Sequence, residues 1–220
     1  MRFRINDIFS SLQGEGHNTG RAATFVRFAG CNLRCPFCDT DFSEYREMSA
    51  EDIVETIKVF PTRFVVLTGG EPSLQVDDAL VSALHDAGFT IAVETNGTRL
   101  LPEGIDWVTV SPKQPLDKAP LPQIDSGRVD EIKVVFDGND NPVLLSVERR
   151  VLSENSDLLS VERRALSENS DTGLTPLFLQ PCDVGDTQQN AEITRKCIEY
   201  IMQHPWWRLS LQTHKMANFK

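Results

Sequence analysis

The chain has 220 residues, of which 40% are hydrophobic, 25% charged and 8% aromatic, a composition typical of folded domains and unlike that of disordered or fibrous chains. The 32 Asp and Glu against 22 Lys and Arg give a formal charge of −10, which repels phosphate backbones and anionic membranes, so we expect no nucleic-acid partner and no membrane partner. The sequence has no run of about 18 apolar residues and its start lacks a secretory signal pattern, so we expect a cytoplasmic protein.

Alternating strand and helix patterns run along the chain. The predicted helices begin at the N-cap Ser49 and stop at Pro61, cover 77–87 before Gly88, and cover 187–203. This alternation predicts parallel strands in βαβ units, and a full eight-fold barrel typically needs about 250 residues, so we expect one α/β domain over residues 1–220, either an open sheet or an incomplete barrel. Short apolar and β-branched runs predict strands at 24–28, 64–67, 90–93, 107–110, 131–136, 177–179 and 208–211.

Residues 144–171 contain a tandem duplication, in which LLSVERRVLSENSD is followed at once by LLSVERRALSENSD. A 14-residue unit present twice is too short for a solenoid. Fourteen residues at 100° each bring the second copy back to within about 40° of the first, so a duplicated amphipathic helix could extend without exposing its apolar face. We predict a tolerated insertion rather than an active-site lid.

Three of the five cysteines, Cys31, Cys35 and Cys38, lie within eight residues. Thiolates bind zinc and iron well and stay reduced in the cytosol, so the cluster favours a metal site over disulfides. Structural zinc needs four protein ligands, whereas an iron–sulfur cluster held by three cysteines leaves one iron open to a ligand. A ferredoxin-like or zinc-binding loop is the alternative, without an obvious fourth ligand. Cys182 and Cys197 have no such spacing and are expected to act as small apolar residues.

Polar or glycine-rich motifs follow most of the predicted strands. They include TGGEP at 68–72, ETNGT at 94–98, SPK at 111–113, QP at 180–181 and QTHK at 212–215. Because the carboxyl ends of parallel strands open on one face of such folds, we expect these motifs to converge on one site.

The segment CNLRCPFC at 31–38, with the aromatic Phe37 before its third cysteine, resembles the signature of the radical S-adenosylmethionine (SAM) enzymes. This resemblance implies an incomplete (β/α) barrel of about six parallel strands, a 4Fe-4S cluster on the three cysteines, and SAM chelated to the open iron. Reduction would cleave SAM to a 5′-deoxyadenosyl radical. The TGGEP segment looks like the family's glycine-rich strand end that binds the methionyl amino group, where glycine permits close backbone approach.

The segments INDIFSSLQGEGHNTG, CDTDF, ETNGT, VSPK, FLQP and RLSLQTHK resemble the 7-carboxy-7-deazaguanine synthase family along nearly the whole length. This resemblance implies a homodimeric carbon-nitrogen lyase that contracts the ring of 6-carboxy-5,6,7,8-tetrahydropterin with loss of ammonia, on the pathway to 7-deazapurines such as queuosine. It implies catalytic use of SAM and an electron donor such as flavodoxin.

The same resemblance assigns roles to single residues. Arg27 would pair with the substrate carboxylate, an interaction suited to a planar guanidinium, and Thr40 would bind magnesium. Lys220 would act through the terminal carboxylate. The SAM contacts implied are Phe37, Cys38, Asp39, Gly70, Ser111, Pro112, Lys113 and Gln180. The substrate contacts implied are Leu12, Gln13, Gly14, Glu15, Arg27, Thr68, His214 and Lys220.

Two other functions are compatible with the cysteine motif but explain less of the sequence. An activase that installs a glycyl radical on a partner protein would use the same cluster, but it needs a broad docking face, whereas the LQGEG and QTHK segments favour a small planar substrate. A non-enzymatic electron carrier would leave TGGEP and SPK unexplained. Because reductants such as flavodoxin are acidic, as this chain is, we also predict a local basic patch near the cysteines that includes Arg34 and Arg46.

Overall fold

The computed structural model describes residues 1–38, 40–41, 43–139, 141–154 and 175–219. Its elements are β1 (Phe3–Leu12), β2 (Ala22–Phe28), β3 (Arg46–Met48), α1 (Ala50–Ile57), β4 (Phe64–Gly69), a 3-10 turn (Pro72–Leu74), α2 (Asp78–Asp86), β5 (Thr90–Thr95), β6 (Trp107–Val110), α3 (Pro122–Asp125), β7 (Glu131–Phe136), α4 (Pro142–Glu154), β8 (Leu177–Pro181), α6 (Thr187–Gln203), β9 (Trp207–Leu209) and α7 (Thr213–Met216).

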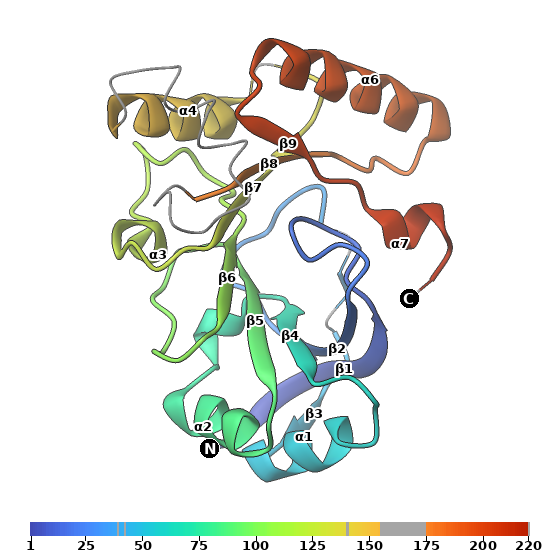
Figure 1. Ribbon diagram of the computed structural model, residues 1–220, viewed down its shortest axis with the longest axis vertical. Helices are drawn as coiled ribbons and strands as arrows, with labels where there is room; N and C mark the ends of the chain where they lie inside the picture. The colour runs from blue at the N-terminus through green and yellow to red at the C-terminus, as the bar shows by residue number, and fades with distance from the viewer. Residues whose placement is uncertain (39, 42, 140, 155–174, 220) are drawn as a thin grey trace.

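One curved sheet of nine strands carries the fold, in the order β3-β1-β2-β4-β5-β6-β7-β8-β9 (Figure 1). The seven strands from β2 to β9 pair in parallel, whereas β1 pairs antiparallel with β2 and β3. The sheet ends at β3 and β9, which do not pair with each other, so the barrel is incomplete, as expected. It has seven parallel strands where the resemblance implied about six.

β1 and β3 were not predicted from the sequence. In β1 the pairing register shifts between Ile5 and Asp7, so the apolar alternation that starts with Phe3 and Ile5 is interrupted by an irregularity of the β-bulge kind. β3 has only three residues, which is too short for a periodic signal.

Local signals fixed the helix boundaries. Ser49 accepts a hydrogen bond from the Asp52 N–H and the Asp52 carboxylate accepts one from the Ser49 N–H, which is a complete capping box at the start of α1. Asp77 and Asp186 cap α2 and α6 in the same general way. The three predicted helices are confirmed. No helix among the described residues is long and apolar enough to cross a membrane.

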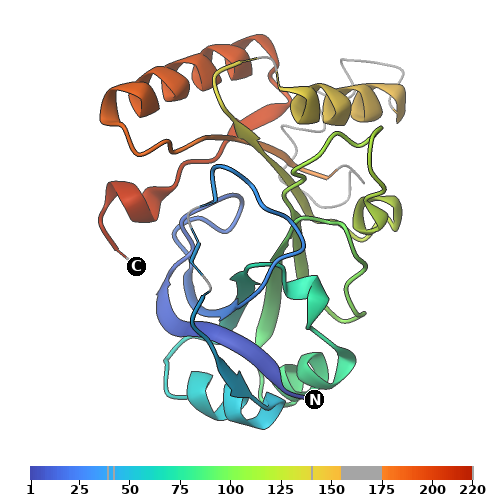
Figure 2. The same ribbon diagram turned by 180° about the vertical axis from the view of Figure 1, so that it is seen from behind.

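The two faces of the sheet have different roles. Alternate residues such as Val65, Leu67 and Val93 point outward into the main core, where they pack against the helices that cover the outer face (Figures 1 and 2). The residues between them point inward, since side chains alternate along a strand. Near the amino ends of the strands the inner residues form a second, smaller core with Phe25, Val66 and other apolar residues. The inner face near the carboxyl ends is left for polar side chains.

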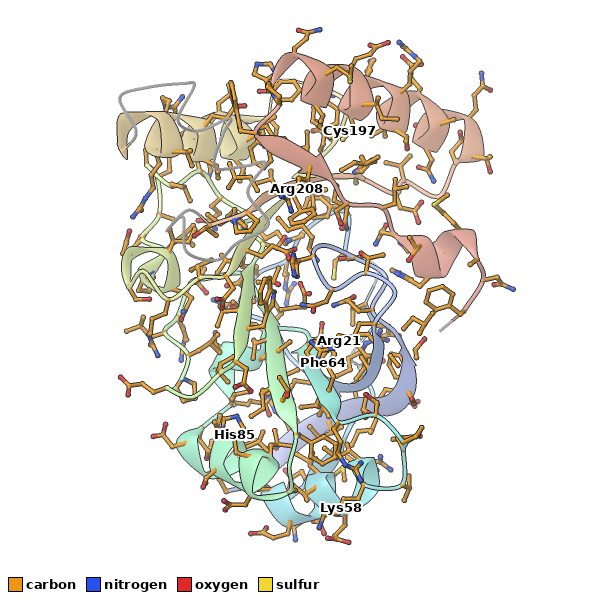
Figure 3. All side chains as sticks on the ribbon, viewed as in Figure 1. Arg21, Lys58, Phe64, His85, Cys197 and Arg208 are labelled. Atoms are coloured by element: carbon orange, nitrogen blue, oxygen red, sulfur yellow. The ribbon has the colours of Figure 1, made fainter. Side chains whose placement is uncertain are left out.

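Cys197 supports the expectation of a structural cysteine. It lies on the buried face of α6, and its thiol contacts the Leu179 carbonyl oxygen of β8 at 3.9 Å (Figure 3). Burial raises the pKa of this thiol to about 12, so it stays protonated and unreactive at neutral pH.

The duplicated segment is described only in part. Residues 144–154, from the first copy, lie in α4, with Leu144 and Val147 in the core and the buried Glu148 carboxylate accepting a hydrogen bond from Trp207 Nε1 at 2.8 Å. The rest of the first copy and the whole second copy lie outside the described residues, so the prediction of a tolerated insertion stays a prediction.

Candidate active site

A cavity of about 310 Å³ opens at the carboxyl ends of the parallel strands. The convergence expected from the strand-end motifs is confirmed by the residues around it. Of the other expected site residues, Pro112 is described but does not line the cavity. Asp39 and Lys220 are not among the residues that the structure describes. The expected site residues that line the cavity are Leu12, Gln13, Gly14, Glu15, Arg27, Cys31, Cys35, Phe37, Cys38, Thr40, Thr68, Gly70, Ser111, Lys113, Gln180 and His214.

The three cysteines lie in the segment that follows β2, which we call the cysteine loop (residues 29–38). The Leu33 N–H donates to Cys31 Sγ at 3.4 Å, so a backbone amide of the loop points at sulfur. Burial raises the pKa of the Cys31 and Cys35 thiols; the Glu71 carboxylate adds to the rise at Cys31, and the Lys113 ammonium opposes it at Cys35.

The donor set of the cysteine loop fits a cluster better than a single ion. Nowhere in the described part of the chain do three His, Cys, Asp or Glu side chains gather as one metal ion requires. An iron–sulfur cluster does not need such convergence, because each thiolate can bind a different iron. Cys31, Cys35 and Cys38, which all line the cavity, would therefore hold three irons of such a cluster and leave the fourth without a protein ligand.

The glycine pair of TGGEP fastens the cysteine loop to β4. The Gly70 N–H donates to the Phe28 carbonyl and the Glu71 N–H to the Gly30 carbonyl, both at 2.9 Å. A Cβ at Gly70 would lie 2.0 Å from the Gly30 oxygen, and one at Gly69 would lie 2.3 Å from the Phe28 oxygen. Close backbone approach was the expected reason for glycine here, and in the structure the approaching backbone is that of the cysteine loop.

A buried polar network continues this attachment. The Glu71 carboxylate accepts hydrogen bonds from Thr95 Oγ1 at 2.6 Å, the Asn96 N–H at 2.7 Å and the Ser73 N–H at 3.0 Å. Asn96 Nδ2 in turn donates to Asn32 Oδ1 of the cysteine loop at 3.0 Å. Sequence reasoning singled out TGGEP and ETNGT but gave Glu71 and Asn96 no role; the structure shows that they tie the cysteine loop to β4 and β5.

Residues 13–21, which we call the closing loop, join β1 to β2 and extend across the open side of the barrel toward β9 and α7 (Figures 1 and 2). The Gly14 carbonyl accepts from the Thr213 N–H at 3.1 Å, and the Gly16 N–H donates to Ser210 Oγ at 2.9 Å. At the other end of the loop the Arg21 guanidinium lies over the Phe64 ring, 3.7 Å from its centre (Figure 3). The open barrel is thus spanned by a loop instead of by strand pairing.

Lys133 lies at the centre of the inner face, with an exposed fraction of 4%. Its Nζ is 2.6 Å from Glu15 Oε2 of the closing loop and 2.9 Å from Glu94 Oε2 of β5. Burial would lower the pKa of Lys133, but Glu15, Glu94 and Glu131 together raise it. Lys133, Glu94 and Glu15 all line the cavity.

The pKa values of the two carboxyl groups that pair with Lys133 shift in opposite directions. Burial would raise the pKa of Glu15, but the ion pair with Lys133 and hydrogen bonds from Lys133 and Gln212 lower it to about 2. For Glu94, burial and the Glu15 charge outweigh Lys133, and its pKa is raised. Lys133 and Glu94 were not predicted as site residues; the signal in the sequence was a charged residue within each apolar strand, at a position that faces inward.

Arg27 and Thr40 both line the cavity. The Arg27 guanidinium lies 5.3 Å from the centre of the Phe9 ring, and no hydrogen bond or ion pair joins it to another described residue. Thr40 lies where the cysteine loop leaves the cavity wall, and its carbonyl is 3.8 Å from Cys38 Sγ. Cys182, expected to be an apolar core residue, is buried but also lines the cavity.

The sequence of residues 25–136 matches the profile of the radical SAM superfamily. Together with the incomplete parallel barrel and the cysteine loop at its carboxyl end, this match makes the chain a radical SAM enzyme.

Comparison with curated proteins narrows the class. The chain is 43% identical over 220 residues to the 7-carboxy-7-deazaguanine synthase of Bacteroides thetaiotaomicron and 40% identical over 242 residues to that of Bradyrhizobium diazoefficiens, with all of each chain covered. The crystal structure of QueE from Escherichia coli matches with a TM-score of 0.71 and 29% identity, covering 96% of this chain and 94% of that one. The chain belongs to the 7-carboxy-7-deazaguanine synthase family.

Proposed function

We propose that the protein is a radical SAM lyase that contracts the ring of 6-carboxy-5,6,7,8-tetrahydropterin to 7-carboxy-7-deazaguanine, with loss of ammonia, in queuosine biosynthesis. One observation carries the proposal beyond family membership: the cysteine loop and the closing loop face the same cavity of about 310 Å³. A cavity lined by both loops suits a small planar molecule bound beside SAM. The glycyl-radical activase would instead need a broad protein-docking face.

The proposed cluster and SAM contacts come from several strand ends. Cys31, Cys35 and Cys38 would hold the 4Fe-4S cluster, which with SAM supplies the carbon-centred radical that removes hydrogen from the substrate. The cavity lining offers polar groups that suit the amino, carboxylate and ribose parts of SAM, both from the cysteine loop and from strand ends. The proposed SAM contacts that line the cavity are Phe37, Cys38, Gly70, Ser111, Lys113 and Gln180. Pro112 is left out of the proposed contacts because it does not line the cavity.

The substrate contacts would come mainly from the closing loop. Gly14 and Glu15 present backbone and carboxylate groups that can recognise the donor edge of a pterin, a kind of contact that discriminates strongly against analogues. Gln13 is held in place, since its Nε2 donates to Glu94 Oε1 at 3.1 Å. Arg27 would bind the substrate carboxylate, and Leu12, Thr68 and His214 complete the proposed substrate wall.

We also propose that the reaction uses Mg²⁺ bound by Thr40. A hard cation that keeps several waters needs few protein ligands, and substrate oxygens would fill the remaining positions. Titration of the reconstituted enzyme with Mg²⁺ should raise turnover in the wild type and fail to do so in Thr40→Val. Equal stimulation of both proteins would contradict the role of Thr40.

The proposed cellular setting follows from the family and from the cysteines. Three thiols that must stay reduced favour the cytoplasm, and the family likeness supports a homodimer and an electron donor such as flavodoxin. Arg34 and Arg46 are both exposed, as a docking role for an acidic donor requires. Charge reversal at both residues should slow flavodoxin-driven turnover but leave dithionite-driven turnover unchanged. Light scattering tests the homodimer, for which we expect twice the mass of one chain.

The decisive experiment is mass spectrometry of an anaerobic reaction of the cluster-reconstituted protein with SAM, a reductant, Mg²⁺ and 6-carboxytetrahydropterin. Formation of 7-carboxy-7-deazaguanine is the expected result. Formation of 5′-deoxyadenosine without that product would overturn the substrate assignment and direct the search toward a protein substrate.

A further inference from the structure

We propose that Lys133 is a positioning residue that holds the closing loop across the open side of the barrel, so that Gln13 and Gly14 are set for the substrate before it binds. The proposal rests on the proposed function for the identity of the substrate, but the geometry of the lock does not depend on that identity. Lys133 acts through Glu15 and Glu94, which come from different parts of the chain.

The lock consists of charged hydrogen bonds inside the barrel. Lys133 Nζ bridges Glu15 of the closing loop and Glu94 of β5 at 2.6 and 2.9 Å. Gln13 Nε2 donates to the other oxygen of Glu94 at 3.1 Å, and Gln212 Nε2 donates to the other oxygen of Glu15 at 2.9 Å. Hydrogen bonds between charged partners are roughly twice as strong as neutral ones, so these contacts fix the residues of the loop nearest the cavity.

The other hydrogen bonds between the closing loop and the strands β7 and β9 and the residues after β9 are weaker, because they do not join two charged groups. The Gly16 N–H donates to a serine hydroxyl, and the Gly14 carbonyl accepts from Thr213, so both ties are neutral. The His17 N–H donates to Glu131 Oε2 at 2.9 Å. Glu131 is buried near Lys133, and burial raises its pKa to about 7, so its charge is only partly present at neutral pH.

Removing the lysine charge would release the loop for a clear reason. Glu15 and Glu94, whose side chains are only 19% and 21% exposed, would then lose the cation that bridges them, and the two neighbouring carboxylates would repel each other. Glu15 is the partner that can move away, because it lies on a loop whereas Glu94 lies in the sheet. The closing loop is therefore the part expected to move.

Hydrogen exchange on the reconstituted holoenzyme tests the lock without using turnover. In Lys133→Met we expect the amides of residues 13–17 to exchange about tenfold faster or more, whereas α1 and α2 keep wild-type protection. Lys58→Met is the matched control, since Lys58 forms an exposed pair with Glu55 on α1, far from the cavity (Figure 3). If Lys133→Met does not fold, Glu15→Gln removes only the loop's partner and gives the same readout.

Kinetics separate positioning from general damage. We expect Lys133→Met to raise the KM for the pterin about tenfold or more, while SAM cleavage to 5′-deoxyadenosine without pterin stays at the wild-type rate. Unchanged loop exchange, or equal loss of SAM cleavage and pterin binding, would overturn the proposal. If the wild type does not turn the pterin over, the proposed function fails, and the exchange result still decides the lock.

Discussion

Replacing Glu131 with glutamine should remove a pH-dependent loss of stability. The Glu131 side chain is 1% exposed, and its Oε1 has no hydrogen-bond partner among the described residues. Burial raises its pKa from 4.5 to about 7; Lys133 opposes the rise, and Glu94 and Glu15 add to it. Glutamine keeps the shape of the glutamate side chain and can still accept a hydrogen bond from the His17 N–H, but it carries no charge at any pH.

The sign follows from proton binding. Between pH 4.5 and about 7 the folded chain keeps a proton on Glu131 that the unfolded chain has lost, so the stabilising contribution is complete below pH 4.5 and is lost as the pH rises through 7. In total, the Glu131 proton contributes about 3.4 kcal/mol to the free energy of unfolding. About 1.4 kcal/mol of this contribution is lost between pH 6 and pH 9. For a chain of this size that corresponds to a Tm difference of about 3–6 °C.

Thermal unfolding of the reconstituted wild type and of Glu131→Gln at several pH values between 6 and 9 measures this difference. We expect the Tm of the wild type to fall relative to that of the variant as the pH rises. Glu103→Gln, at an exposed carboxylate, should follow the wild type. If the wild type and Glu131→Gln show parallel pH dependence, then Glu131 is ionised in the folded protein throughout this range and the argument from burial is wrong.

Three further changes test other parts of the site. Gly70→Ala places a methyl group 2.0 Å from the Gly30 oxygen, so we expect a cost of about 1–3 kcal/mol and low iron content after reconstitution; full iron loading would contradict this. Arg27→Gln should raise the KM for the pterin roughly 10- to 100-fold and leave SAM cleavage without pterin unchanged. Deletion of residues 158–171 should leave a folded, active enzyme, and an inactive protein with a wild-type circular dichroism spectrum would refute the idea of a tolerated insertion.

The sequence alone determined the features that depend on neighbouring residues. The helix start at Ser49 was readable because a cap bonds to an amide only a few residues away, and the structure shows the same kind of cap at Asp77 and Asp186. The inner strands were readable because buried parallel strands are continuous apolar runs. The position of the site followed from the motifs at strand ends, since a parallel sheet brings those ends to one face. The irregular β1 and the three-residue β3 gave no such signal.

Only the tertiary structure decided which of the polar residues act together. Lys133 meets partners 118 and 39 residues away in the sequence, and Gly16 meets Ser210, 194 residues away. No local pattern encodes such pairs, because they depend on which strand faces which across the barrel. The same holds for Glu131, whose pKa is set by burial under the closing loop. The sequence alone showed that the cysteines and glycines lie at strand ends. The pairing of the charges that hold the closing loop depends on the fold, because an unpaired charge inside the barrel is energetically unfavourable.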